Sequence, residues 1–294
     1  MELIGNGSDE TEDSFQEWAG RVLSHSFMTN NSTPIHPAHR DNSDRPTLSV
    51  VVPVHNEEQN IVLLAEEISA VLQGNLTYEI VYVDDGSSDN SHKILEDLTS
   101  TLTGFRAIQH LYRCGQSAAI YSGVLAASAP LVLTLDGDGQ NDPTDIPLIL
   151  ETYYTHAGED GRLMVSGWRK RRNDSWDKRF SSRIANTLRS GLLLDKTPDT
   201  GCGLKVFRRE DFLVLPTFDH MHRFLPALML HAGARVMSVE VNHRPRLHGK
   251  SNYGLFDRLW VGIIDLFGVT WLYRRRIEVE VREIGTSSNE TGHA

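Results

Sequence analysis

Three carboxylates follow directly on an apolar run. The stretch LTLDGDGQNDP, residues 133–143, looks like the end of a buried strand and then places Asp136, Asp138 and Asp142 within seven residues. Mg²⁺ and Mn²⁺ prefer oxygen ligands and take one or two carboxylates together with substrate phosphates. A glycine-rich turn, with Asp142 capping a helix that begins at Pro143, fits the same residues. The stretch alone therefore assigns Asp142 to a cap and leaves metal binding and a plain turn open for the other two.

Two further polar clusters also follow apolar runs. HNEE, residues 55–58, comes after LSVVVPV, and DDGSSD, residues 84–89, comes after YEIVYV. The adjacent carboxylates of Asp84 and Asp85 repel each other near a low dielectric. They are tolerated if one accepts hydrogen bonds from a ligand, such as a nucleobase N–H or a ribose hydroxyl, and the other from backbone amides. The alternative is a helix N-terminus, where the macrodipole favours acidic side chains.

The elements that must position these clusters alternate between strand and helix. Continuous apolar runs predict buried strands, and apolar residues at helical spacing predict helices between them. The strands are predicted at residues 48–55, 78–86, 106–111 and 130–136, and the helices at 57–72, 88–98 and 116–127. This alternation indicates an α/β fold with a mostly parallel sheet and helices on both faces. All three clusters then lie at the carboxyl edge of the sheet, where ligands bind in such folds.

The rest of the chain has a looser pattern. Strands are predicted at residues 163–168, 202–207 and 235–245, a basic amphipathic helix at 176–194 and a further helix at 222–232. Residues 1–45 read as a disordered acidic tail, because they have too few apolar side chains to offset the entropy of ordering. We therefore expect one large domain over residues 46–250, a helix over 251–276 and a polar tail over 277–294.

Composition excludes several classes of protein. The chain has 294 residues and a net charge of −10, so its bulk charge predicts no nucleic-acid partner. Cys114 and Cys202 form neither a disulfide framework nor a zinc motif, and a reducing cytosol is the expected compartment. No secretory signal is apparent, and no apolar run reaches the ~18–20 residues of a spanning helix.

Four motifs in series resemble those of a known family. VVVPVHNEEQNI, EIVYVDDGSSDNS, LTLDGDGQNDP and DTGCGLKVFRRE occur in this order. Together they resemble family 2 glycosyltransferases, and most closely the polyprenyl-phosphate (dolichol-phosphate mannosyltransferase-like) branch, over about Leu48 to Tyr273. The resemblance implies a GT-A fold, with a nucleotide-sugar half over about 46–160 and an acceptor half over about 161–250. It also implies inverting, Mg²⁺- or Mn²⁺-assisted transfer of a sugar from a nucleotide-sugar to a lipid phosphate. Mannose is the reference sugar, and UDP-glucose, UDP-galacturonate and a UDP-aminoarabinose derivative are alternative donors.

The resemblance assigns roles on the donor side. Asp85 matches the position that reads the base, with Asp84 beside it. The residues that match the nucleotide pocket are Pro53, Asn56 and Glu57, and those that match the cation site are Asp136, Asp138 and Gln140. The cation would bridge the diphosphate and offset the charge that develops on the departing nucleotide.

The acceptor side needs positive charge, because a lipid phosphate is an anion. Arginine suits bidentate contact with phosphate. The residues that match or accompany acceptor-phosphate ligands are Arg169, Ser182, Arg183 and Asn186, with Arg246, Lys250 and Ser251 in a later basic loop. Asp199 would orient the acceptor or accept a proton. For any single arginine the alternative is a solvated face.

The late apolar segment raises the question of a membrane. Leu259 to Tyr273 is 15 residues, or about 22 Å of helix, which is shorter than a ~30 Å hydrocarbon core. Trp260, Trp271 and the arginines at 274–276 suit a helix that lies at an anionic interface. This predicts a peripheral enzyme on the cytoplasmic face of a membrane, or one recruited by an integral membrane partner. A core-packed helix is the alternative.

Other functions fit less well. A processive polysaccharide synthase would carry QxxRW and several spanning helices, and neither is found. A dinucleotide oxidoreductase would carry GxGxxG after its first strand, where this chain has VPVHNEE. A non-catalytic protein that binds a nucleotide-sugar or a lipid phosphate stays open, although the intact Asp-x-Asp disfavours it.

Overall fold

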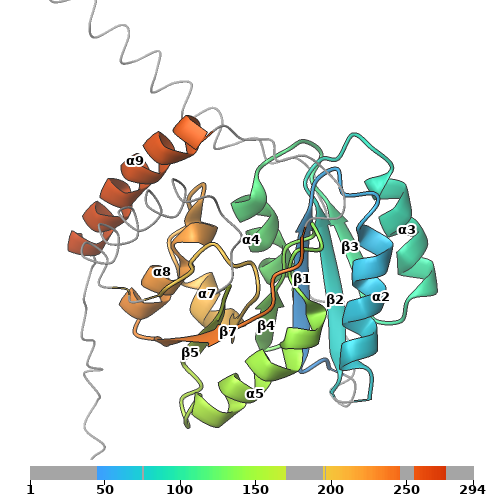
Figure 1. Ribbon diagram of the computed structural model, residues 1–294, viewed down its shortest axis with the longest axis horizontal. Coiled ribbons are helices and arrows are strands. Elements are labelled where there is room, and N and C mark those ends of the chain that lie inside the picture. Colours follow the sequence, from blue (N-terminus) through green and yellow to red (C-terminus); the bar gives the residue numbers. More distant parts are fainter. Residues whose placement is uncertain (1–44, 75, 170–194, 196, 246–254, 276–294) are drawn as a thin grey trace, which may run out of the picture. The chain divides into compact units, whose positions relative to one another are not determined.

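A seven-stranded mixed sheet forms the centre of the fold (Figure 1). The computed structural model describes residues 45–275, apart from 75, 170–194, 196 and 246–254. The strands lie in the order β3-β2-β1-β4-β6-β5-β7. Their bounds are β1 Leu48–Val54, β2 Tyr78–Asp84, β3 Phe105–Gln109, β4 Leu131–Thr134, β5 Leu163–Trp168, β6 Lys205–Arg208 and β7 Arg235–Glu240.

The predicted parallel pairing is confirmed for the first four strands. β1 pairs in parallel with both β2 and β4, and β2 pairs in parallel with β3. β6 runs against both of its neighbours, β4 and β5, whereas β5 and β7 pair in parallel. The sheet is thus mostly parallel, with β6 as its one reversed strand, between β4 and β5.

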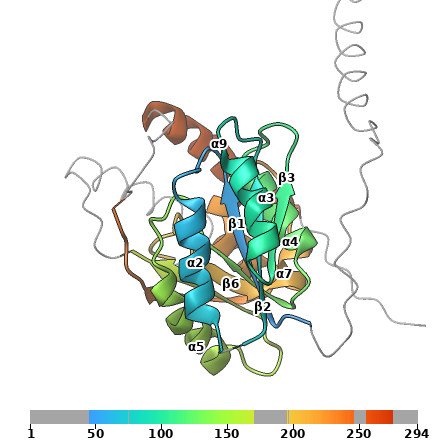
Figure 2. The same ribbon diagram turned by 90° about the vertical axis from the view of Figure 1, so that its right-hand side faces the viewer.

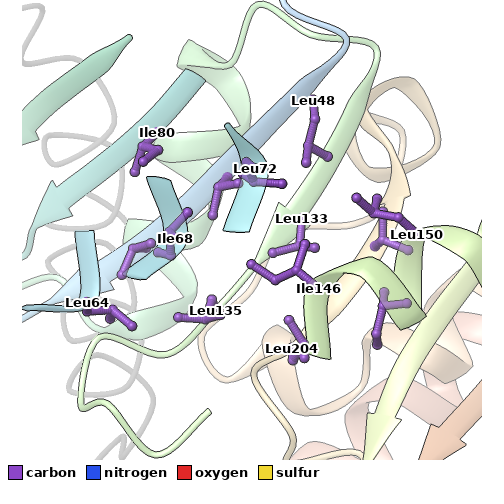
Figure 3. Close-up of a cluster of buried hydrophobic side chains, with 14 of the residues drawn as sticks. Leu48, Leu64, Ile68, Leu72, Ile80, Leu133, Leu135, Ile146, Leu150 and Leu204 are labelled. Atoms are coloured by element: carbon purple, nitrogen blue, oxygen red, sulfur yellow. The ribbon is translucent and has the colours of Figure 1, made fainter. Parts of the chain in front are cut away.

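Helices cover both faces of the sheet, as predicted (Figure 2). The side chains of β1 alternate, so Leu48, Val50 and Val52 enter one core and Val51 enters the other. The first core includes side chains from α2 (Ile61–Leu72), α3 (Ser91–Thr101) and α5 (Ile146–His156). The second includes side chains from α4 (Gln116–Ala126), α7 (Arg209–Leu213), α8 (Leu225–His231) and α9 (Leu255–Arg274). Figure 3 shows part of the first core, with Ile68 and Leu72 of α2 and Leu133 of β4 among its buried side chains.

Small residues let α4 lie close to the sheet, as its sequence predicts. A Cβ on Gly123 would stand 2.4 Å from Cγ1 of Val51 and 3.1 Å from Cγ2 of Val83. Only glycine fits between α4 and the sheet at this contact. The close packing sets the position of the first residues of α4, which border the site described below.

The predicted helix cap at Asp142 is confirmed. Its carboxylate accepts hydrogen bonds from the amide nitrogen of Thr144 at 3.0 Å and from the Thr144 hydroxyl at 2.6 Å. A short 3₁₀ turn, η1 (Pro143–Asp145), begins there and leads directly into α5. Asp142 therefore has a structural role distinct from that of Asp136 and Asp138.

One face of α9 packs on the core and another is exposed. Val269 is buried, and Leu266 and Tyr273 pack against the second core. The Tyr273 ring stacks on that of His231, with 3.3 Å between the ring centroids. Ile264, Phe267 and Trp271, at helical spacing, are 66%, 65% and 61% exposed. Within the described residues, no helix has the length and apolar content that crossing a membrane requires.

Candidate active site

The polar clusters meet at the carboxyl edge of the parallel strands. The ends of β1 and β2 are joined by a hydrogen bond from the amide of Asp85 to the carbonyl of Val54, at 2.8 Å. The amide of His110, just after β3, donates to the carbonyl of Asp84 at 2.8 Å. Leu135, just after β4, donates to the carbonyl of Val51 at 3.1 Å. Strand register alone thus places the three clusters side by side.

Asp136 lies at the end of β4 and is held by its neighbours. Its carboxylate accepts a hydrogen bond from the side-chain amide of Gln116 at 2.9 Å, and its backbone amide donates to Oδ1 of Asn141 at 3.1 Å. Burial, reinforced by the charge of Asp138, raises the pKa of Asp136 to about 6, although Lys205 and Arg169 act in the opposite direction. A buried carboxylate whose ionisation is opposed by a neighbouring carboxylate fits a divalent cation, whose charge would stabilise its ionised form.

The turn that carries Asp138 and Gln140 is tied to the segment after β7. The backbone amide of Gln140 donates to Oδ1 of Asp138 at 3.1 Å, and its carbonyl accepts from the amide of Arg244 at 3.0 Å. The guanidinium of Arg244 donates to Asp142 at 2.7 Å and to Glu67 of α2 at 2.8 Å. Residues after β7 therefore position the candidate cation site, and sequence reasoning did not identify Arg244.

Asp84 and Asp85 are buried, and both accept hydrogen bonds from backbone amides. Asp84 accepts from the amide of Ser87 at 2.9 Å. Asp85 accepts from the amides of Cys114 at 2.7 Å and Gly115 at 2.8 Å, and its Oδ1 lies 2.8 Å from Nδ1 of His110. Burial alone would raise the pKa of Asp85, but these partners hold it below its usual range. The pair thus supports the loop at 110–115, and contact of Asp85 with a base stays a prediction.

The residues predicted to line the nucleotide pocket connect two of the clusters. Asn56 adopts a left-handed backbone with a φ of 57°. Its amide donates to the Ser87 hydroxyl at 2.9 Å, and its side-chain oxygen accepts from the amide of Ser88 at 2.7 Å. Glu57 accepts from the side-chain amide of Asn60 at 2.6 Å, and Pro53 lines the cavity described below. These contacts hold the HNEE and DDGSSD loops together.

Two of the residues predicted to act on the acceptor bind each other. Arg169 donates to Asp199 through Nε at 2.7 Å and Nη2 at 3.0 Å, and the side chains are only 11% and 8% exposed. Burial lowers the pKa of Arg169, but the carboxylate outweighs it and raises that pKa above its ordinary value. Asp199 is therefore placed to orient Arg169, and the charge of Arg169 acts on Asp136. The other predicted phosphate ligands, Ser182, Arg183, Asn186, Arg246, Lys250 and Ser251, lie outside the described residues.

A cavity of about 290 Å³ opens beside Asp136. Its lining includes Gln116, Lys205, His222 and Arg223, none of which sequence reasoning assigned to the site. Nδ1 of His222 lies 2.7 Å from the Ser117 hydroxyl, and burial lowers the pKa of His222 to about 3, so the ring is neutral. Lys205 is the one charged residue in the apolar stretch LKVF, and this was the feature of the sequence that could have identified it.

Comparison with known proteins agrees with the motifs. Residues 49–214 match the family described as Glycosyl transferase family 2. The chain is 34% identical over 218 residues to an undecaprenyl-phosphate 4-deoxy-4-formamido-L-arabinose transferase of Aeromonas hydrophila, covering 73% of this chain and 65% of that protein. It is also 34% identical over 235 residues to a dodecaprenyl-phosphate galacturonate synthase of Rhizobium johnstonii, covering 77% of this chain and 67% of that one. The chain thus spans about two thirds of the length of these relatives.

Solved structures show the same fold. A glucosyl-3-phosphoglycerate synthase of Mycobacterium tuberculosis, solved with Mn²⁺, UDP and product, has a TM-score of 0.56 at 20% identity, over 81% of this chain and 86% of that one. A mannosyltransferase of Pyrobaculum calidifontis, solved with GDP-mannose and Mn²⁺, has a TM-score of 0.55 at 17% identity, over 87% and 71%. The GT-A fold implied by the motifs is confirmed, and this chain belongs to glycosyl transferase family 2.

Proposed function

We propose that the chain catalyses inverting transfer of a sugar from a nucleotide-sugar to a polyprenyl phosphate. The proposal rests on one observation: two pairs of residues, Asp136 with Asp138 and Arg169 with Asp199, lie at the same edge of the sheet. The first pair fits a cation on a diphosphate, and the second offers a buried, oriented guanidinium to a second anion. The family and the polyprenyl-phosphate transferases among its relatives support the same reaction class.

Asp136 and Asp138, with Gln140, would hold Mg²⁺ or Mn²⁺, which would offset the charge of the departing nucleotide diphosphate. Gln116 and Asn141 keep Asp136 in place. A lipid phosphate is already ionised near neutral pH, so its attack on the sugar does not require a strong general base. Asp199 would act through Arg169, which would align the phosphate for in-line displacement. Orientation and charge neutralisation then supply most of the rate enhancement.

The relatives bear on the choice of donor sugar. Mannose was the reference choice, but the relatives described above are named for an arabinose derivative and for galacturonate. We therefore place these sugars ahead of mannose. UDP-glucose and GDP-mannose stay in the set to be tested.

The exposed face of α9 is where we place the membrane surface. Ile264, Phe267 and Trp271 present apolar side chains, and the exposed Arg274 and Arg275 follow them at the end of the helix. Such a face suits the headgroup region of an anionic leaflet. Peripheral binding at the cytoplasmic face would bring the active site to a lipid-bound acceptor, with or without an integral membrane partner.

The test is transfer of label to lipid. The protein is incubated with undecaprenyl-phosphate vesicles, Mg²⁺ or Mn²⁺ and labelled UDP- and GDP-sugars, and lipid is then extracted. We expect one donor to label the lipid and Asp138→Ala to abolish the label. Asp97→Ala, an exposed carboxylate on α3, serves as the control.

Two outcomes would contradict the proposal. If the protein binds a nucleotide-sugar but no donor labels lipid, it is a non-catalytic binding protein. If Asp138→Ala transfers as well as the wild type, the cation site is elsewhere.

A further inference from the structure

The cavity beside Asp136 has the size and place of a sugar subsite. Its volume of about 290 Å³ lies at the lower end of ligand pockets, which hold ~300–1,000 Å³. It is suited to a single sugar rather than to a whole nucleotide-sugar. Asp136 forms part of its wall, so a group in the cavity would adjoin the diphosphate that the cation holds.

Lys205 places a buried amino group in this cavity. Burial lowers the pKa of Lys205, and Cys202, Asp136 and Asp199 oppose that shift. The residue lies on β6 and is 4% exposed, and its ammonium donates to the carbonyl of Cys202. Within the described part of the chain, no carboxylate lies within 4.0 Å of this ammonium. Burying a cation without a paired anion is costly, because the loss of water is not offset by a close opposite charge.

The nearest carboxylates already have other partners. Asp136 and Asp199 both act on Lys205 electrostatically. Asp199 is matched by the bidentate Arg169, and Asp136 would be matched by the bound cation. In a loaded site both carboxylates would be matched by other cations, so an anionic group of the ligand would be what favours the charged form of Lys205.

The other polar groups of the cavity do not change this balance. His222 is neutral, and the side-chain amide of Gln116 is used by Asp136. Arg223 is a second cation in the lining, and it acts on the carboxylate of Asp265 in α9. Lys205 is thus the more deeply buried of the two cations that an anionic ligand in the cavity would meet.

We propose that this cavity receives the donor sugar and that Lys205 selects a sugar bearing a carboxylate, a hexuronic acid. The inference rests on the proposed function and narrows its substrate class. A carboxylate in place of the C6 hydroxymethyl group would form a charge-assisted hydrogen bond with the ammonium. A neutral hexose would leave Lys205 with the carbonyl of Cys202 and no carboxylate in contact.

Matched donor pairs that differ only at C6 test the proposal. The pairs are UDP-glucuronate with UDP-glucose, UDP-galacturonate with UDP-galactose, and GDP-mannuronate with GDP-mannose. Transfer is measured as kcat/KM, and Mn²⁺-dependent binding is measured by equilibrium dialysis. We expect the wild type to prefer the uronate of one pair by roughly 10- to 100-fold, the range of a hydrogen bond to a charged group.

Three variants locate the preference. Lys205→Met should remove it, Lys205→Arg should retain most of it, and Lys93→Met, at an exposed position on α3, should leave it unchanged. Thermal unfolding of each variant separates loss of fold from loss of selectivity. If Lys205→Met does not fold, comparing the two donors of each pair with the wild-type protein still shows whether a uronate is preferred.

The outcomes separate this inference from the proposed function. Transfer of a neutral hexose in preference to its uronate would overturn the inference and leave the transferase proposal standing. Absence of transfer from every donor would refute the proposed function. The Mn²⁺-dependent binding of the two donors of each pair would still test whether the cavity prefers a uronate. If Lys205→Met instead raised the KM for undecaprenyl phosphate equally with both donors of a pair, Lys205 would bind the acceptor phosphate and the uronate assignment would be wrong.

Discussion

Replacing Gly203 by alanine should displace the Asp136 carboxylate without unfolding the protein. A Cβ on Gly203 would lie 2.2 Å from Cγ, and 2.3 and 2.4 Å from the two carboxylate oxygens, of Asp136. Ordinary van der Waals contact begins near 3.4 Å. The carbonyl of Gly203 is held by the hydroxyl of Thr134 at 2.7 Å, just before the paired strand β6. The carboxylate must therefore make most of the movement, about 1 Å.

The substitution should lower the rate of transfer strongly and the free energy of unfolding only slightly. A misplacement of about 1 Å at a reacting centre lowers the rate on the order of 100-fold. Gly203 does not have a left-handed φ, so alanine adds no backbone strain there. Overpacking of this kind lowers the free energy of unfolding by about 1–3 kcal/mol. The loss should appear as a lower kcat and a weaker dependence on Mn²⁺.

The assay is the initial rate of lipid labelling across a Mn²⁺ titration, with urea unfolding measured in parallel. Gly268→Ala is the matched control, because a Cβ there would meet no atom within 4 Å. Wild-type rate and Mn²⁺ dependence in Gly203→Ala would show that Asp136 does not hold the cation in this geometry. The cation site would then have to be sought elsewhere.

Three other perturbations test separate parts of the site. Asp199→Asn should lower the free energy of unfolding by about 3 kcal/mol in urea, because it leaves Arg169 buried without its ion partner; an unchanged midpoint would contradict that pairing. Burial raises the folded-state pKa of Asp136 to about 6, so Mn²⁺ affinity should fall as the pH drops through 6. In the metal-free protein the free energy of unfolding should rise over the same pH range, because the folded state binds this proton more tightly than the unfolded state does. A Mn²⁺ titration followed by electron paramagnetic resonance checks the predicted loss of affinity, and a Mn²⁺ affinity that stays constant down to pH 5 would refute it. Replacing Phe267 and Trp271 by Ser should release the protein from anionic vesicles, and unchanged sedimentation would mean that the exposed face of α9 does not bind lipid.

Local sequence patterns predicted the elements between residues 48 and 145 well. Val50 and Val51 point to opposite faces of β1, and the continuous apolar run around them indicated a strand buried on both sides. Asp142 followed by Pro143 indicated a helix start, and the cap is formed by the predicted side chain. These features depend on neighbouring residues, which is why a sequence can reveal them.

The part of the chain after residue 161 was harder to predict. The stretch at 205–208 reads as a strand whichever way it runs, so its local pattern does not reveal that β6 is antiparallel to β4 and β5. That reversal is what places Lys205 in the wall of the cavity with Asp136. Direction within a sheet depends on the path of the connecting chain, which local periodicity does not encode.

The sequence by itself determined the alternation of elements, and it predicted a candidate site at the carboxyl edge from the metal-type spacing of Asp136 and Asp138. Only the tertiary structure decided the partners: Asp199 with Arg169, Gln116 with Asp136, and Arg244 with the turn at Gln140. These pairs are separated by 20 to 104 positions in the chain. Spacing within one element is set by backbone geometry, whereas contacts between elements are set by how the sheet and its helices pack.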